Sequence, residues 1–186
     1  MSKRITVQLN EQSVQDALDK IETYKDSLIW KCTVIVSELQ KIGIQTMVEN
    51  KGEYGSYIIF EKTAIEQTAN GARCAISMSD AEKIVRSWKT KKGGVKTAEV
   101  SPILMTEFGS GRNALEDANV PGVGPGTFPG QKHALDPDGW WWIDADDKNN
   151  VWQHSTGHTP TLPMHRAIYE MREQIVEVAR RVFADG

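Results

Sequence analysis

Three histidines near the C-terminus come closest, by type and spacing, to a catalytic metal site. His154 and His158 are four positions apart and His165 follows closely. Imidazoles with this spacing bind zinc when a helix brings both rings to one face. Gly157 disfavours a helix here, and the H-E-x-x-H glutamate is missing. We therefore expect polar loop histidines. A small metal-dependent hydrolase that uses this cluster, together with His133, is the alternative hypothesis.

Two other segments resemble an ion site and a phosphate site, but each lacks residues that the chemistry requires. Asp144–Asn150 is acidic like a calcium loop, yet Asn149 and Ser155 stand where an EF-hand has glycine and glutamate. Gly122–Gly126 has glycines spaced as in a dinucleotide-binding turn, but Thr127 replaces the third glycine. The sequence therefore predicts no cofactor and no bound metal.

Composition and charge are those of an ordinary soluble domain. The 186 residues carry a formal net charge of −3, which disfavours a dedicated nucleic-acid-binding protein. There is no run of about 20 apolar residues, so no transmembrane helix is expected. The basic N-terminus lacks the apolar stretch of a signal peptide, which predicts a cytoplasmic protein. Cys32 and Cys74 form no C-x-x-C pair, so we expect free thiols.

Apolar periodicity predicts a helix near each end of the chain. After the helix-start residues Asn10–Ser13, apolar residues recur in steps of three, four and seven, which describes one stripe of a long helix. Gly43 would bend or end that helix. The stripe comprises Val14, Leu18, Ile21, Leu28, Cys32, Ile35, Leu39 and Ile42. The C-terminal helix is expected to bury Met164, Ile168, Met171, Ile175, Val178 and Val182.

Between the helices, alternating patterns and turn signals predict antiparallel strands. Asn70-Gly71 is a strong hairpin signal, because both residues accept positive φ. A short helix should cover Ile103–Phe108, and residues 109–139 form a Gly/Pro-rich insertion loop. Strands are expected at Ile5–Leu9, Tyr57–Phe60, Cys74–Met78, Ile84–Trp88, Val95–Val100 and Trp140–Trp142. The prediction is a single α+β domain, residues 1–186, with an antiparallel sheet of about four to six strands, a protruding hairpin, and the C-terminal helix packed on the sheet.

Aromatic and charged residues gather in two neighbouring regions. Three successive strand residues, Trp140–Trp142, cannot all enter one core, and aromatic side chains are enriched at interfaces. The Ile84–Val100 hairpin is basic, whereas the tryptophan region is acidic. One interpretation is that the basic hairpin and the acidic tryptophan region are ordinary solvated faces. The other is that the hairpin of one subunit meets the acidic region of the next, where complementary charge fixes how the subunits align. The predicted oligomer or partner interface comprises Lys89, Lys91, Lys92, Phe128, Trp140, Trp141, Trp142, Asp144 and Asp146.

Two short segments carry a family resemblance. Thr106–Gly111 reads T-E-F-G-S-G, and Thr159–Ala167 reads T-P-T-L-P-M-H-R-A and leads into the last helix. With the tryptophan-bearing strand between them, they resemble the tail-component or neck (tail-completion, head–tail joining) proteins of long-tailed bacteriophages.

The resemblance implies a non-enzymatic virion protein that forms a ring at the head–tail junction, as a hexamer. Its implied partners are copies of itself, the head–tail connector, and the tail-tube or tail-terminator proteins, with no membrane and no sequence-specific nucleic acid. It would be made in the host bacterial cytoplasm and end in the virion. A prophage-encoded adaptor with the same α+β pattern is a further alternative.

Overall fold

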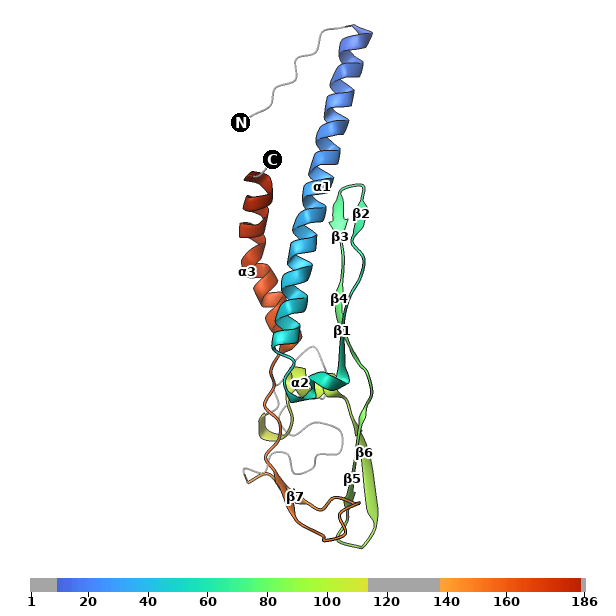
Figure 1. The fold of residues 1–186 in the computed structure, drawn as a ribbon, viewed down its shortest axis with the longest axis vertical. Helices are drawn as coiled ribbons and strands as arrows, with labels where there is room; N and C mark the ends of the chain where they lie inside the picture. The colour runs from blue at the N-terminus through green and yellow to red at the C-terminus, as the bar shows by residue number, and fades with distance from the viewer. Residues whose placement is uncertain (1–9, 114–137, 185–186) are drawn as a thin grey trace.

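The longest element is helix α1, Glu11–Glu49, which runs along most of the molecule (Figure 1). The computed structural model describes residues 10–113 and 138–184. Asn10 caps the helix, because its side-chain oxygen accepts a hydrogen bond from the Ser13 backbone N–H at 2.8 Å. The helix passes through Gly43 without ending and closes at Asn50, whose N–H donates to the Thr46 carbonyl at 3.2 Å.

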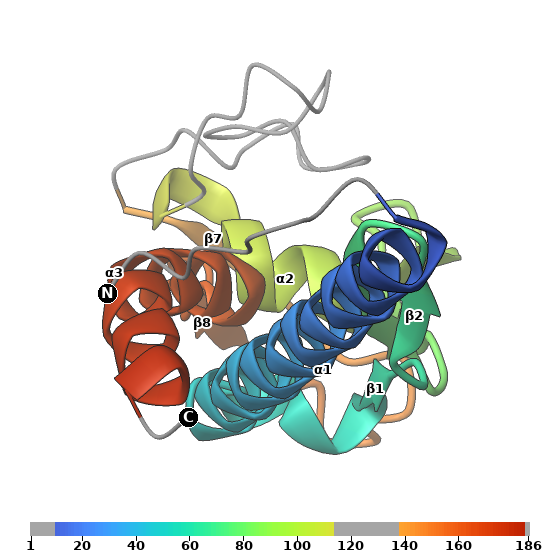
Figure 2. The same ribbon diagram turned by 90° about the horizontal axis from the view of Figure 1, so that it is seen from above.

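Helix α3, Pro163–Ala184, packs antiparallel against the C-terminal half of α1 (Figures 1 and 2). The sequence had predicted that this helix packs on a sheet, and that prediction is wrong, because its main partner is α1. Gly43 allows the close approach, because a Cβ there would lie 2.8 Å from both Ile76 Cδ1 and Met171 Sδ. An Arg181–Glu38 ion pair also joins the two helices.

The face that α3 buries is narrower than predicted. Val178 and Val182 are buried, and Met171 is half-buried. Ile168 and Ile175, which were expected in the core, are 49% and 47% exposed. Because α1 is the main partner of α3, it covers one side of the helix and leaves the neighbouring stripe to solvent.

A long two-stranded ribbon follows the side of α1 opposite to α3 (Figure 2). Its tip is the turn Ala69-Asn70, one residue before the predicted Asn70-Gly71 turn, because Gly71 already pairs with Thr68 in the ladder. The ladder is interrupted between its two halves, and there the buried Gln40 of α1 donates hydrogen bonds to the carbonyls of Thr63 and Ala75 at 2.9 and 3.2 Å. A short 3-10 helix, Glu53–Tyr57, precedes the ribbon. The strands are β1 Ile58–Lys62, β2 Glu66–Thr68, β3 Gly71–Arg73 and β4 Ile76–Asp80, paired β1 with β4 and β2 with β3.

Just past the end of α1 lies the short helix α2, Pro102–Phe108, and two further strand pairs lie beyond it, at the end of the molecule opposite to the start of α1 (Figure 1). Strands β5 and β6 lie almost where the sequence predicted them. The elements are β5 Ile84–Lys89 with β6 Val95–Val100, helix α2 Pro102–Phe108, the 3-10 helix Gly111–Asn113, and β7 Trp140–Trp142 with β8 Gln153–Ser155.

The expected single sheet of four to six strands does not form among the described residues. Strands pair only two by two, in four separate ladders. The first two ladders extend along α1 as one ribbon, so their strands add length to it instead of widening a sheet. The predicted strand Ile5–Leu9 and residues 114–137 of the predicted insertion loop lie outside the described residues. None of the described helices is long and apolar enough to cross a membrane.

Candidate functional site

The two segments that carry the sequence resemblance lie against each other. The Ser110 N–H donates to the His158 carbonyl, and the His158 N–H donates to Ser110 Oγ, both at 2.9 Å. The N–H groups of Thr161 and Leu162 both donate to the Thr106 carbonyl, at 2.9 and 3.2 Å. We call residues 106–111 and 157–165 the junction; the second range contains the first seven residues of the segment Thr159–Ala167. The junction joins the end of α2 to the start of α3.

Glu107 caps helix α3 from outside that helix. Its Oε2 accepts from the Met164 N–H and its Oε1 from the His165 N–H, each at 2.9 Å. These are first-turn donors, which have no partner within the helix, and a carboxylate also suits the positive end of the helix dipole. Pro163 opens the helix, where its missing N–H costs nothing. Only 8% of Glu107 is exposed, so the cap is an internal part of the structure.

The same arrangement occurs one element earlier. Asp80, the last residue of β4, accepts from the Ile103 N–H at 3.0 Å and from Ser101 Oγ at 2.7 Å, at the start of α2. An acid at the end of β4 therefore caps α2, and Glu107 within α2 caps α3. Two successive carboxylate caps thus link the end of β4 to the start of α2, and α2 to the first turn of α3.

Two glycines let the backbones of the junction cross. Gly157 has φ +102°, and a Cβ there would collide with the Ser110 carbonyl oxygen and lie 2.9 Å from Gly111 Cα. Gly109 has φ +75°, and its Cβ would lie 2.7 Å from Pro160 Cδ. Both positions combine a left-handed backbone with backbone crowding, so only glycine fits. The glycines of the T-E-F-G-S-G segment are therefore explained by packing.

The interior of the junction is polar. Thr106 Oγ1, Thr161 Oγ1 and His158 Nε2 are buried and have no protein partner. Buried groups of this kind are usually satisfied by ordered water.

The structure does not bring the three C-terminal histidines together. His158 pairs through Nδ1 with Glu53 Oε1 at 2.8 Å and packs its ring against Tyr54, with centroids 4.8 Å apart. His154 instead stacks on Trp141, and His165 is exposed on α3. In the described part of the chain, no three His, Cys, Asp or Glu side chains are grouped to hold a metal ion.

Tyr54, the ring against which His158 packs, has a raised pKa. Burial of the hydroxyl is the main cause, and the neighbouring Glu53 charge is the second.

The basic hairpin and the acidic turn meet within one chain. Lys89 Nζ donates to the Asp147 carbonyl and to Asn150 Oδ1, both at 2.7 Å. The Lys89 N–H also donates to the Ile143 carbonyl at 3.0 Å. The Lys89 charge is thus already engaged by its own chain, whereas Lys91 and Lys92 in the β5–β6 turn are exposed.

Asp147 organises that turn. Its carboxylate accepts from the backbone N–H groups of Asn149 at 2.8 Å and Val151 at 2.7 Å. These two bonds, from Val151 first and Asn149 second, lower its pKa, with a smaller contribution from the Lys89 charge. Of the predicted interface acids, Asp146 is exposed, while Asp144 is half-buried and accepts from the Asp146 N–H at 2.9 Å.

The tryptophans alternate as expected for a strand. Trp140 and Trp142 are half-buried, whereas Trp141 is 61% exposed and stacks on His154 with centroids 4.5 Å apart. Trp152, which was not among the predicted interface residues, is 57% exposed. Phe128, the remaining predicted interface residue, lies outside the described residues.

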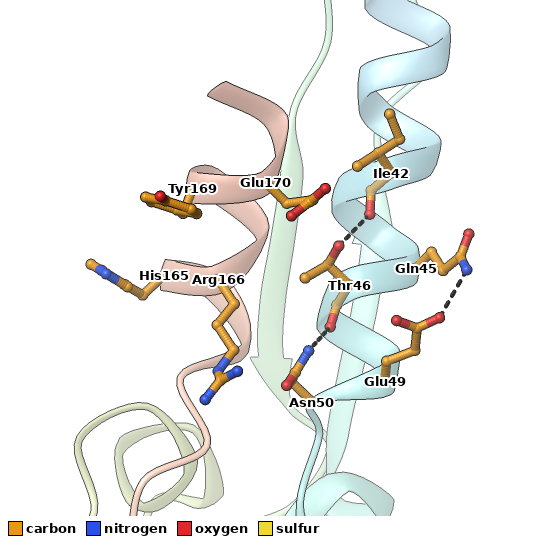
Figure 3. A pocket seen from close by; sticks show the side chains of 9 residues that line it. All are labelled: Ile42, Gln45, Thr46, Glu49, Asn50, His165, Arg166, Tyr169 and Glu170. Atoms are coloured by element: carbon orange, nitrogen blue, oxygen red, sulfur yellow. Dashed lines mark hydrogen bonds between the residues drawn. The ribbon is translucent and has the colours of Figure 1, made fainter. Parts of the chain in front are cut away.

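An open groove of about 490 Å³ runs between α1 and α3 beside the junction (Figure 3). Several of its polar groups bond within their own helix. Thr46 Oγ1 donates to the Ile42 carbonyl, and Gln45 Nε2 donates to Glu49 Oε1. The groove therefore presents no converging set of reactive groups. It is lined by Ile42, Gln45, Thr46, Glu49, Asn50, His165, Arg166, Tyr169 and Glu170.

Comparisons of the chain with protein-family models, with curated proteins and with solved structures give no match.

Sequence reasoning missed the residues that hold the site together. Glu107 lies inside the T-E-F-G-S-G segment. Nothing in that segment predicted that the Glu107 carboxylate binds the backbone N–H of Met164, 57 residues away. Asp80 and Gln40 likewise act across long sequence separations. The available signal was indirect. A proline opening the last helix without an N-cap residue before it implies that the cap comes from elsewhere.

Proposed function

We propose that the protein is a non-enzymatic structural subunit of the neck or tail-completion apparatus of a tailed bacteriophage, and that it forms a ring at the head–tail junction. One observation carries the proposal: the fold leaves many large apolar side chains exposed to solvent. Among the described residues, seven hydrophobic side chains are buried, whereas seventeen large ones are 43–61% exposed. Large exposed apolar patches mark interaction sites in soluble proteins.

These exposed residues are grouped. One group lies on the N-terminal half of α1, a second on the outer side of α3, and a third at the far end around Trp141 and Trp152. A subunit with several separate faces is suited to contact more than one neighbour. Head-to-tail contacts between unlike faces close into a ring when the rotation permits.

The phage assignment is supported by the sequence resemblance. The segments that carry it, Thr106–Gly111 and Thr159–Ala167, meet in the junction and hold α3 through Glu107. The proposed partners are copies of itself in a hexamer, the head–tail connector, and the tail-tube or tail-terminator protein. The proposed location is the virion.

The purified full-length chain tests self-assembly. Native mass spectrometry and light scattering over increasing concentration should show a discrete oligomer with six as the leading stoichiometry. Deletion of the gene from a phage or prophage that carries it should give tailless heads beside free tails, restored by supplying the protein. Intact virions from the deleted strain would contradict the proposal. So would stoichiometric zinc combined with hydrolytic turnover that replacement of His158 abolishes.

A further inference from the structure

We infer that the projecting N-terminal half of α1, residues 11–27, docks on the outer face of α3 of a second copy of this chain. The inference rests on the proposed ring and names the contact that builds it. Below, these residues of α1 are called the arm.

The arm extends beyond the other described elements. The upper part of α1 stands clear of both α3 and the β2–β3 tip (Figure 1). At about 1.5 Å per residue, seventeen residues span roughly 25 Å. Val14, Leu18, Ile21 and Tyr24 are 44%, 53%, 53% and 56% exposed. Their steps of four, three and three put them on one face. The apolar stripe of α1 therefore continues past the region that α3 covers.

A second uncovered face lies on α3. Ile168, Ile175, Val176 and Phe183 are 49%, 47%, 54% and 48% exposed, and the Lys31 ammonium of the same chain's α1 lies over the Phe183 ring, 4.9 Å from its centroid. The last three of these apolar residues follow Ile168 by seven, eight and fifteen residues, which places all four on one side of the helix. This outer face spans roughly 22 Å at the helical rise per residue, similar to the arm.

The two faces carry opposite charge. The arm holds five acidic residues and two lysines, a net charge of −3. On α3, Arg172 falls within the outer face and Arg180 at its edge, both exposed. Glu173, seven residues before Arg180, shares that edge, so these three charged groups of the outer face sum to +1, whereas Glu170 and Glu177 lie on the far side of the helix. Two arms would repel each other, whereas an arm and an outer face attract.

The chain itself provides a precedent for this pairing. Farther along α1, the same helix already packs against α3, and an acid of α1 meets an arginine of α3 in the Glu38–Arg181 pair. Because the arm and the outer face are different surfaces, their contact is head-to-tail. Each subunit keeps one free surface of each kind until the ring closes.

Cysteine cross-linking tests the contact in full-length protein with Cys32 and Cys74 replaced by serine. Leu18→Cys and Ile175→Cys variants are treated with a short bismaleimide, alone and mixed. We expect little cross-linking in either alone, a covalent dimer in the mixture, and a ladder of higher species when both cysteines share one chain. Thr23→Cys, on the opposite side of the arm, is the matched control with Ile175→Cys. It should cross-link at least about tenfold less.

The outcomes separate this contact from the ring itself. Dimers of Leu18→Cys alone would mean that arms pair with each other, and would overturn the inference. An oligomer that forms without the mixed cross-link would overturn the inferred contact between the arm and α3, but not the proposed ring. A monomer at every concentration would overturn both.

Charge reversal is the second measurement. Glu11→Lys with Glu22→Lys, or Arg172→Glu with Arg180→Glu, should each weaken assembly at least about tenfold, and combining them should restore it.

Discussion

The carboxylate of Glu107 accepts a hydrogen bond from the backbone N–H of His165 at 2.9 Å, so a residue of one helix caps the first turn of another. The second carboxylate oxygen holds Met164 in the same way. The cap is buried and charged, which makes it stronger than a typical exposed N-cap.

Replacing Glu107 should therefore destabilise the protein. We expect Glu107→Ala to cost about 2 kcal/mol in the free energy of unfolding, since two first-turn donors lose their partner. Glu107→Gln should cost about 1 kcal/mol, because the amide oxygen satisfies one donor only. Chemical denaturation followed by circular dichroism measures both. Glu173→Ala, which replaces an exposed glutamate on α3, should change stability by less than about 0.5 kcal/mol. Equal effects at Glu107 and Glu173 would contradict the capping role.

Gly157→Ala should disrupt the junction. The added methyl group meets the Ser110 carbonyl, and the φ of +102° is itself unfavourable for alanine. We expect a loss of about 3 kcal/mol or more in the free energy of unfolding. Gly94→Ala is the control, because its Cβ would meet only Thr90 Oγ1 at an ordinary 3.5 Å. Wild-type stability of Gly157→Ala in thermal unfolding would contradict the close approach of the backbones at Gly157 and Ser110.

Gly43 offers a test of the α1–α3 contact. Alanine at this position gains about 1 kcal/mol of helix propensity, which offsets small shifts of the Ile76 and Met171 side-chain ends. Gly43→Ala should therefore stay within about 1 kcal/mol of wild type. Gly43→Leu should lose about 3 kcal/mol, because the larger side chain separates the helices.

Met171→Ala provides the second half of a double-mutant cycle. It should recover part of the loss in the Gly43→Leu background, although it destabilises the wild-type protein. Strictly additive effects of the two substitutions would show that Gly43 and Met171 do not share a contact.

Asp147 gives a pH dependence of known sign. Its folded-state pKa is depressed, so the ionised carboxylate contributes stability that is present at neutral pH and is lost as the pH falls through the folded value. Asp147→Asn should be less stable than wild type at neutral pH, and the difference should narrow below the ordinary aspartate pKa of about 3.9. Denaturant titrations at several pH values measure this gap. Asp146→Asn is the neighbouring control. A gap for Asp147→Asn that does not depend on pH would contradict the assignment.

The local elements were predictable because their signals are local. The apolar stripe after Asn10 predicted α1, and the Asn70-Gly71 signal predicted the hairpin at the tip of the ribbon to within one residue. What the sequence did not reveal is which faces meet. Ile168 and Ile175 share the periodicity of Val178 and Val182, yet only the latter pair is buried. Periodicity gives the sides of a helix but not its partner.

The interface residues show the same limit. Local alternation predicted that the three tryptophans cannot all enter one core, and Trp141 is the one that is exposed. Alternation could not predict that Lys89 binds the Asp147 carbonyl, because 58 residues separate them in the chain. The inference that Lys91, Lys92 and Trp141 contact another subunit remains a prediction.

The relay of caps from Asp80 to Glu107 has a consequence for biosynthesis. A nascent chain that ends before Met164 leaves the Glu107 carboxylate without its two backbone donors. Helix α3, which is synthesised after Glu107, supplies both those donors and the surface inferred to receive a neighbouring copy. Chains truncated before α3 would therefore lack the inferred docking surface as well as the cap.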